Sequence, residues 1–107
     1  MSGLDAIDEA AMQRLRKIGG DDLIGELTAI FLRNTPDRIQ TARTAVRSGD
    51  LNQVMLVAHS LKSSCANLGA RHMRQIAAEA EQLALNRDAT RLPDLIEQLA
   101  GSFEGVR

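Results

Sequence analysis

The chain has few of the residues on which many small domains depend: one cysteine, two prolines, two phenylalanines, and neither tryptophan nor tyrosine. The single cysteine, Cys65, excludes an internal disulfide and a cysteine-rich zinc site. The absence of Trp and Tyr removes most base-stacking platforms, and a net charge of -1 without a basic cluster gives no footprint for nucleic acid. The longest apolar run, 54–58, is far too short to enter a membrane. We therefore expect a cytoplasmic protein that binds neither nucleic acid nor membrane.

The residues that are present indicate one folded domain. A length of 107 residues suffices for a single core, and contents of 44% hydrophobic and 25% charged residues are typical of a soluble globular domain. No repeat, linker or alternating strand pattern divides the chain, so residues 1–107 are expected to form one unit. Apolar residues recur instead at steps of three and four, the spacing of one helix face.

Glycine, proline and capping residues between these apolar stripes indicate where the expected helices begin and end. The pair Gly19-Gly20 ends a first helix, and Asp21 or Asp22 caps the next. Thr35 is placed as an N-cap and Pro36 as the first residue of a new helix, so the chain should kink or restart there. Short connections make consecutive helices antiparallel neighbours. The expected fold is all-α, an up-and-down antiparallel four-helix bundle with a short extra N-terminal helix. The stripes lie at Leu4, Ile7, Ala11, Leu15 and Ile18, then Leu23 or Ile24, Leu27, Ile30 or Phe31, then Ile39, Ala42 and Val46, with further helices over about 51–68, 70–86 and 90–103.

The helix expected over 51–68 carries the most informative segment. At about 100° per residue its apolar residues gather on one side, which should face the core. His59 lies about 140° from that side and Ser63 about 180°, so both should face solvent, with Lys62 at the boundary. The core side comprises Leu51, Val54, Val57, Ala58, Leu61, Cys65 and Leu68.

The surroundings of His59 suit phosphoryl transfer. Its helix neighbours are Met55, Lys62, Ser63 and Ala66. A neutral imidazole nitrogen can attack a phosphoryl group, and the product brings negative charge to the helix surface. Lys62, one of only two lysines among 13 basic residues, would offset that charge as a mobile point charge. Ser63 could donate a hydrogen bond, and the small Ser63 and Ala66 would allow a partner's backbone to come close.

At these residues the sequence resembles a known family. The run His59-x-x-Lys62-Ser63-Ser64-x-x-x-Gly69, with Asn67-Leu68 inside it, is similar to the signature of histidine-containing phosphotransfer (HPt) domains of bacterial multistep two-component phosphorelays. The resemblance extends over almost the whole chain. It implies that His59 is phosphorylated, that Lys62 is its electrostatic partner, and that the surrounding patch docks a response-regulator receiver domain. Met55, Ala66 and Asn67 are the candidate docking residues.

Two positions near the motif need comment. The family usually has glycine where this chain has Ser63, a departure that bears on partner choice or transfer rate and not on the chemistry. The family also often supports the phosphohistidine with a polar residue from the following helix. Glu81 and Gln82 lie near the right distance along the chain, and we choose Gln82 because a glutamate would be a poor phosphate ligand.

The remaining candidates have plainer interpretations. Cys65 shares the core face and should be a small buried hydrophobe. A metal site built on His59 and His72 lacks a third ligand. Glu79 and Glu81 are two apart on a helix and should lie on a solvated face. The arginines 38, 43 and 47 either solubilise their helix or orient an acidic partner, and the sequence does not choose between these roles.

Two hypotheses of different classes follow. The first is a phosphorelay intermediate that accepts a phosphoryl group on His59 from a receiver aspartyl phosphate and passes it to another receiver. No nucleotide-binding loop is present, so the chain is not expected to be a kinase, and it should need no cofactor of its own because the receiver would supply Mg²⁺. A hybrid histidine kinase is an expected partner, and the chain, expected to be a monomer, could be free-standing or part of such a kinase. The second hypothesis is a non-catalytic helical interaction module that uses the same face.

Overall fold

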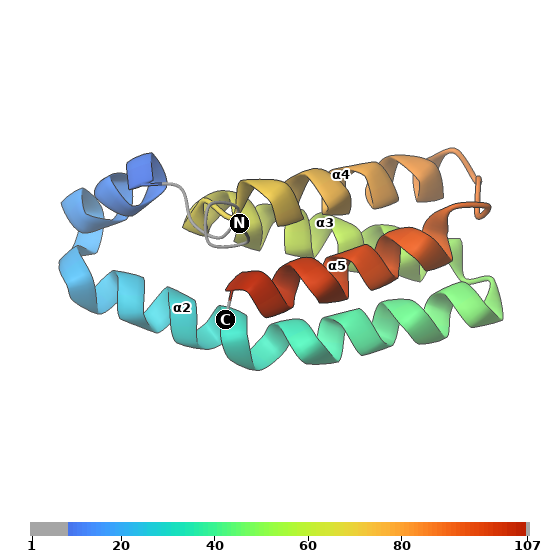
Figure 1. Cartoon of the computed structure of the whole chain (residues 1–107), viewed down its shortest axis with the longest axis horizontal. Helices are drawn as coiled ribbons and strands as arrows, with labels where there is room; N and C mark the ends of the chain where they lie inside the picture. The colour runs from blue at the N-terminus through green and yellow to red at the C-terminus, as the bar shows by residue number, and fades with distance from the viewer. Residues whose placement is uncertain (1–8, 107) are drawn as a thin grey trace.

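The computed structural model describes residues 9–106, which form helices joined by short turns. The helices are α2 (Glu9–Ser48), α3 (Leu51–Leu68), α4 (Arg71–Leu85) and α5 (Leu92–Val106). Each helix packs against the next along the chain, and α5 packs back against α2 (Figure 1). The predicted all-α bundle is confirmed. No helix within residues 9–106 is both long and apolar enough to cross a bilayer.

The short extra N-terminal helix is present as the first part of α2. Gly20 has backbone angles of φ 69° and ψ -164° and divides α2 there, as the Gly19-Gly20 pair predicts. Of the first predicted stripe, Ala11 and Leu15 are buried, whereas Leu4 and Ile7 lie outside the described residues. Ile18 was expected in the core, and this is wrong: it is 77% exposed, because the helix breaks at Gly20 before another helix covers that turn.

The predicted restart at Thr35-Pro36 is also wrong. The helix runs through both residues, and Gly20 alone is non-helical within α2. A proline inside a helix costs about 3 kcal/mol through a lost hydrogen bond and a ring clash. Phe31, Thr35 and Ile39 are all buried at steps of four, so a continuous core-facing stripe crosses the proline and offsets that cost.

The connection between α3 and α4 is a tight turn that sets the two helices side by side. Gly69 adopts a left-handed conformation with φ 74°, and the Ala70 amide donates to the Cys65 carbonyl at 2.9 Å. At the other end of α3, the Asp50 carboxylate accepts from the Gln53 amide at 3.1 Å, which is the predicted cap. Residues at equal distances before and after Gly69 therefore lie opposite one another.

The core lies along the bundle axis and consists almost entirely of aliphatic side chains. The two phenylalanines, Phe31 of α2 and Phe103 of α5, meet edge to face with ring centroids 5.6 Å apart. The core face of α3 is as predicted, with Leu51 partly rather than fully buried. The largest fully buried apolar side chains are Val54, Leu61, Met73, Leu92, Leu95, Ile96 and Leu99.

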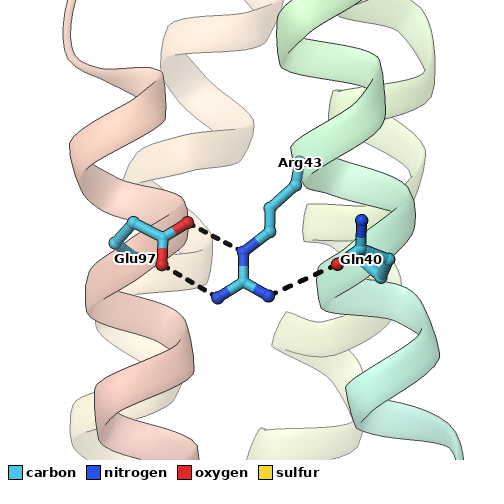
Figure 2. Close-up of polar contacts among 3 residues, drawn as sticks. All are labelled: Gln40, Arg43 and Glu97. Atoms are coloured by element: carbon cyan, nitrogen blue, oxygen red, sulfur yellow. Dashed lines mark hydrogen bonds and ion pairs between the residues drawn. The ribbon is translucent and has the colours of Figure 1, made fainter.

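An exposed ion pair joins α2 to α5, the helices that close the bundle. Arg43 donates from Nε and Nη2 to the two carboxylate oxygens of Glu97, each at 2.8 Å. Its Nη1 lies 3.4 Å from Oε1 of Gln40 on the same helix. Figure 2 shows the guanidinium of Arg43 between Gln40 of α2 and Glu97 of α5. The contact with Glu97 gives Arg43 a structural role. Arg38, another of the three arginines whose role the sequence left open, donates to Ser64 Oγ at 3.3 Å.

Candidate functional site

His59 lies on the solvent side of α3, as the helical wheel predicts. Its side chain is 61% exposed, whereas Leu61 and Cys65 on the opposite side are fully buried. The buried side fixes the rotation of α3 about its own axis, since apolar residues at steps of three and four must face the bundle. The imidazole therefore points to solvent from a helix whose opposite face is packed in the core.

A carboxylate from α4 holds both His59 and Lys62. Nδ1 of His59 lies 2.8 Å from Oε2 of Glu81, and Nζ of Lys62 lies 2.6 Å from Oε1 of the same carboxylate. The Glu81 side chain is only 14% exposed, in contrast to the histidine. Because Glu81 engages two α3 residues that are three apart, the three side chains form one cluster across the α3–α4 contact.

The electrostatics of the cluster keep Glu81 ionised. The pKa of Glu81 is lowered, mainly by the hydrogen bond from Lys62. Burial opposes this effect, and the hydrogen bond with His59 then lowers the pKa further. An ionised carboxylate can only accept, so Nδ1 of His59 carries the ring proton in the neutral imidazole. Nε2 then holds the free lone pair and has no partner within the described part of the chain.

The sequence placed both Glu81 and Gln82 near the right distance and favoured Gln82, whereas the structure brings Glu81 to His59. Gln82 is exposed and donates to Asn86 Oδ1 at 3.5 Å along its own helix. The expectation of a solvated face also fails for Glu81, while Glu79 is exposed and pairs with Arg91. The usable signal was the Gly69 turn, because residues about ten positions before and after an antiparallel turn lie opposite each other.

The other candidate residues lie on the same side of α3. Ser63 and Asn67 are exposed, and Met55 and Ala66 are partly buried. Ser63 is one turn beyond His59, although no contact joins the two side chains. Asn67 lines a shallow pocket with Ser64 and residues of α2. The structure thus gathers these residues on one surface and brings only Lys62 into the charged cluster.

Two exposed leucines flank the cluster and were not singled out in the sequence. Leu56, 59% exposed, precedes His59 by one helical turn, and Leu85, 51% exposed, follows Glu81 by one turn. Because α3 and α4 are antiparallel, Leu56 and Leu85 are displaced from the His59–Glu81 contact in the same direction along the bundle axis. Each leucine therefore lies one turn from a member of the charged cluster, Leu56 on α3 and Leu85 on α4.

The remaining candidates take no part in the cluster. Cys65 is fully buried, and burial raises the pKa of its thiol to about 12, so it is not a nucleophile. His72 lies exposed at the start of α4. Within residues 9–106 no group of three or more His, Cys, Asp or Glu side chains is placed to hold a metal ion.

A four-helix bundle that presents an imidazole with a free Nε2, braced by a carboxylate and adjoined by a lysine, belongs to the class of histidine phosphocarriers. Residues 26–107 match the family model of the Hpt domain, and the chain belongs to this family. It acts as a histidine phosphotransfer protein in a phosphorelay and interacts with receiver domains.

Comparison of structures supports the same assignment. The crystal structure of histidine-containing phosphotransfer protein B (HptB) from Pseudomonas aeruginosa PAO1 superposes with a TM-score of 0.88 at 28% sequence identity. The match covers 94% of this chain and 87% of the HptB chain. No curated protein sequence matches the chain.

Proposed function

We propose that His59 is the residue that carries the phosphoryl group in this phosphorelay protein. The observation that carries the proposal is the cluster of His59, Lys62 and Glu81. The carboxylate at 2.8 Å from Nδ1 orients the ring and directs Nε2 toward solvent, where another protein can reach it. His72, the other histidine, has no part in this cluster.

The transfer step needs only groups that the two proteins supply. The Nε2 lone pair attacks the phosphorus of a receiver aspartyl phosphate, an N–P bond forms, and the P–O bond to the aspartate breaks, which returns a free carboxylate to the receiver. Nδ1 keeps its proton during this step. The reverse reaction with an aspartate of a second receiver then releases the phosphoryl group from His59.

Lys62 and Ser63 are proposed to assist the phosphoryl group. Lys62 is one turn from His59 and its side chain is 35% exposed, so its flexible stem can follow a phosphoryl group arriving at Nε2. The Ser63 hydroxyl is exposed on the same face and could donate a further hydrogen bond. A positive charge that meets the phosphoryl group stabilises the charge of the transition state in both directions.

The docking face is proposed to surround His59 on α3. Met55, Ala66 and Asn67 border the cluster, and the small Ala66 allows close approach of a partner's backbone. The face combines the charged cluster with apolar contact area, a composition that suits a protein partner whose active site is rich in carboxylates.

The wider setting is also part of the proposal. A receiver domain of a hybrid histidine kinase is the donor and a separate response regulator the acceptor, and Mg²⁺ comes from the receiver in each complex. The protein acts as a monomer in the cytoplasm. These assignments rest on the family relationship.

A label-transfer experiment tests the role of His59. A ³²P-labelled receiver domain is incubated with the wild-type protein, with His59→Gln and with His72→Gln as the matched control. We expect acid-labile label on the wild type and on His72→Gln, and none on His59→Gln. Transfer that persists in His59→Gln would overturn the assignment. A stable receiver complex without transfer in the wild type would instead support the alternative, a helical interaction module.

A further inference from the structure

The contact of the Glu81 carboxylate with Nδ1 of His59 affects the protonation of the ring as well as its orientation. We propose that Glu81 retains the Nδ1 proton of His59 throughout the transfer cycle and so holds the phosphohistidine in its cationic-ring form, which is a ready phosphoryl donor. The inference rests on the proposed role of His59 and assigns a positioning and tuning role to a residue that does not touch the phosphoryl group.

The geometry suits Glu81 to this task. Its carboxylate is 14% exposed and is held by two contacts, to Nδ1 of His59 at 2.8 Å and to Nζ of Lys62 at 2.6 Å. The contact with Lys62 fixes one carboxylate oxygen and leaves the other directed at the ring. A carboxylate that is mostly excluded from water interacts more strongly with a neighbouring cation than a solvated one does.

The charge balance of the transfer step shows why the proton matters. Attack by neutral Nε2 on phosphorus produces a ring that bears both the new N–P bond and the original Nδ1 proton, with one positive charge. In water the ring can lose this proton and become a neutral phosphoimidazole, whose imidazole would have to leave as an anion. With Nδ1 protonated, neutral imidazole is the leaving group and the N–P bond breaks more easily.

Glu81 favours the protonated ring by its full negative charge. An opposite charge within hydrogen-bond distance stabilises the charged form of a titrating group by about one to three pH units. Because the His59 side chain is 61% exposed, solvent screening weakens this stabilisation. The contact therefore favours the phosphohistidine ring that keeps its Nδ1 proton.

Lys62 strengthens the arrangement when the phosphoryl group arrives. Before transfer the ammonium is bound to Glu81, and it must turn toward the phosphoryl oxygens to neutralise them. When the ammonium turns away, Lys62 no longer neutralises the Glu81 carboxylate. The full negative charge of Glu81 then acts on the ring as the ring becomes positive. Three charged side chains of α2 and α4 are engaged elsewhere: Arg38 contacts Ser64, Arg43 contacts Glu97, and Glu79 contacts Arg91.

The variant Glu81→Gln isolates the charge from the geometry. Its single amide oxygen can still accept from Nδ1, so the contact that orients the ring is kept while the negative charge and the Lys62 ion pair are lost. Glu79→Gln, two residues away and exposed, is the matched control. The phosphorylated proteins are titrated by ³¹P NMR between pH 5 and 9, and their phosphoryl transfer to an unphosphorylated receiver is timed at pH 7.

The expected results are specific. In Glu81→Gln the titration midpoint of the phosphohistidine falls by about one pH unit, and donation at pH 7 slows by up to about tenfold, as one unit of protonation implies. Glu79→Gln behaves as wild type. In the wild type, unfolding in urea lowers the midpoint as well, which tests the inference without any substitution.

Two failures can be told apart. Absence of label on His59 in the wild type would refute the proposed function itself. Label on His59 with the same ³¹P midpoint in wild type, Glu81→Gln and urea would leave the phosphocarrier role intact and overturn the role of Glu81. Slower donation in Glu81→Gln with an unchanged midpoint would also overturn it, since loss of geometry alone then explains the rate.

Discussion

Nζ of Lys62 lies 2.6 Å from Oε1 of Glu81, so before transfer the lysine is bound to a carboxylate of the neighbouring helix. This contact does two things. It places the ammonium within one turn of His59, and it holds the carboxylate that contacts the ring. Lys62 therefore belongs to the site even when no phosphoryl group is present.

Lys62→Ala is expected to fold and to accept phosphoryl groups about tenfold more slowly, because one partly exposed charge that meets the transition state contributes on the order of 1.4 kcal/mol. The Lys62 side chain is 35% exposed, so the effect should fall below that of a fully buried donor. Stopped-flow measurement of label transfer from a receiver checks the rate. Lys17→Ala, which changes the only other lysine of the sequence, is the control, and a wild-type rate in Lys62→Ala would remove the assigned role.

Ser63→Arg is expected to obstruct the receiver without unfolding the bundle. The residue is exposed one turn beyond His59, where a long side chain would meet the partner's backbone. We expect at least tenfold weaker receiver binding by calorimetry and an unchanged helical circular-dichroism spectrum. Thr44→Arg, an equally small-to-large change at an exposed position of α2, should leave binding unchanged. Equal binding by both variants would mean that the docking face lies elsewhere.

The bundle and the exposure of His59 could be predicted because both depend on local periodicity. The apolar residues of α3 recur at helical spacing, and the same pattern that buries Leu61 and Cys65 turns His59 outward. The Gly20 and Gly69 turns were also predictable, since both glycines have positive φ angles that other residues rarely adopt.

Glu81 and the continuity of α2 could not be predicted in the same way, because both depend on contacts between helices. Periodicity gives the direction of a side chain on its own helix, and Glu81 lies near the edge of the buried stripe of α4. Only the packing of α4 on α3 makes that edge face Lys62. At Pro36 local preference favoured a break, and the buried stripe through Phe31 and Ile39 overrode it.

Thr35→Val is expected to stabilise the protein. The Thr35 side chain is 1% exposed, and its hydroxyl has no hydrogen-bond partner within the described residues. A buried, unsatisfied polar group costs about 1–3 kcal/mol, and valine has nearly the same shape and helix propensity. Urea denaturation should show a gain of about 1–2 kcal/mol, whereas Thr44→Val at an exposed position should change little. A loss of stability would show that the hydroxyl is satisfied in solution.

Stability should fall in acid because three carboxyl groups have pKa values below their ordinary ones. Hydrogen bonds from Lys62 to Glu81 and from Arg43 to Glu97 lower the pKa values of these glutamates from 4.5, and a backbone amide lowers that of Asp88 from 3.8. A lowered folded-state pKa gives stability that is complete above the unfolded-state pKa and is lost as pH falls through the folded-state pKa.

The urea midpoint should therefore be level from about pH 7 to 5.5 and fall steadily below about pH 4.5. Glu81→Gln removes one of these groups and should make the fall less steep, whereas Glu26→Gln at an exposed position of α2 should keep the wild-type slope. The same slope for Glu81→Gln and wild type would show that the Glu81 contacts do not stabilise the folded protein.

The exposed leucines Leu56 and Leu85 should contribute binding energy to the receiver complex. Both leucines are about half exposed in the free protein, at 59% and 51%, so a partner that covers one would bury roughly half of a leucine side chain, about 1 kcal/mol. Leu56→Gln should therefore weaken receiver binding about fivefold. The free energy of unfolding should stay within about 0.5 kcal/mol of wild type, as for most surface changes. Ile18→Gln, which changes a residue that is 77% exposed in the N-terminal part of α2, is the control. Calorimetric titration with the receiver distinguishes the two sites. Equal losses of affinity in both variants would mean that any added polar side chain weakens binding. No loss in Leu56→Gln would place the partner's apolar contact away from this end of the α3–α4 pair.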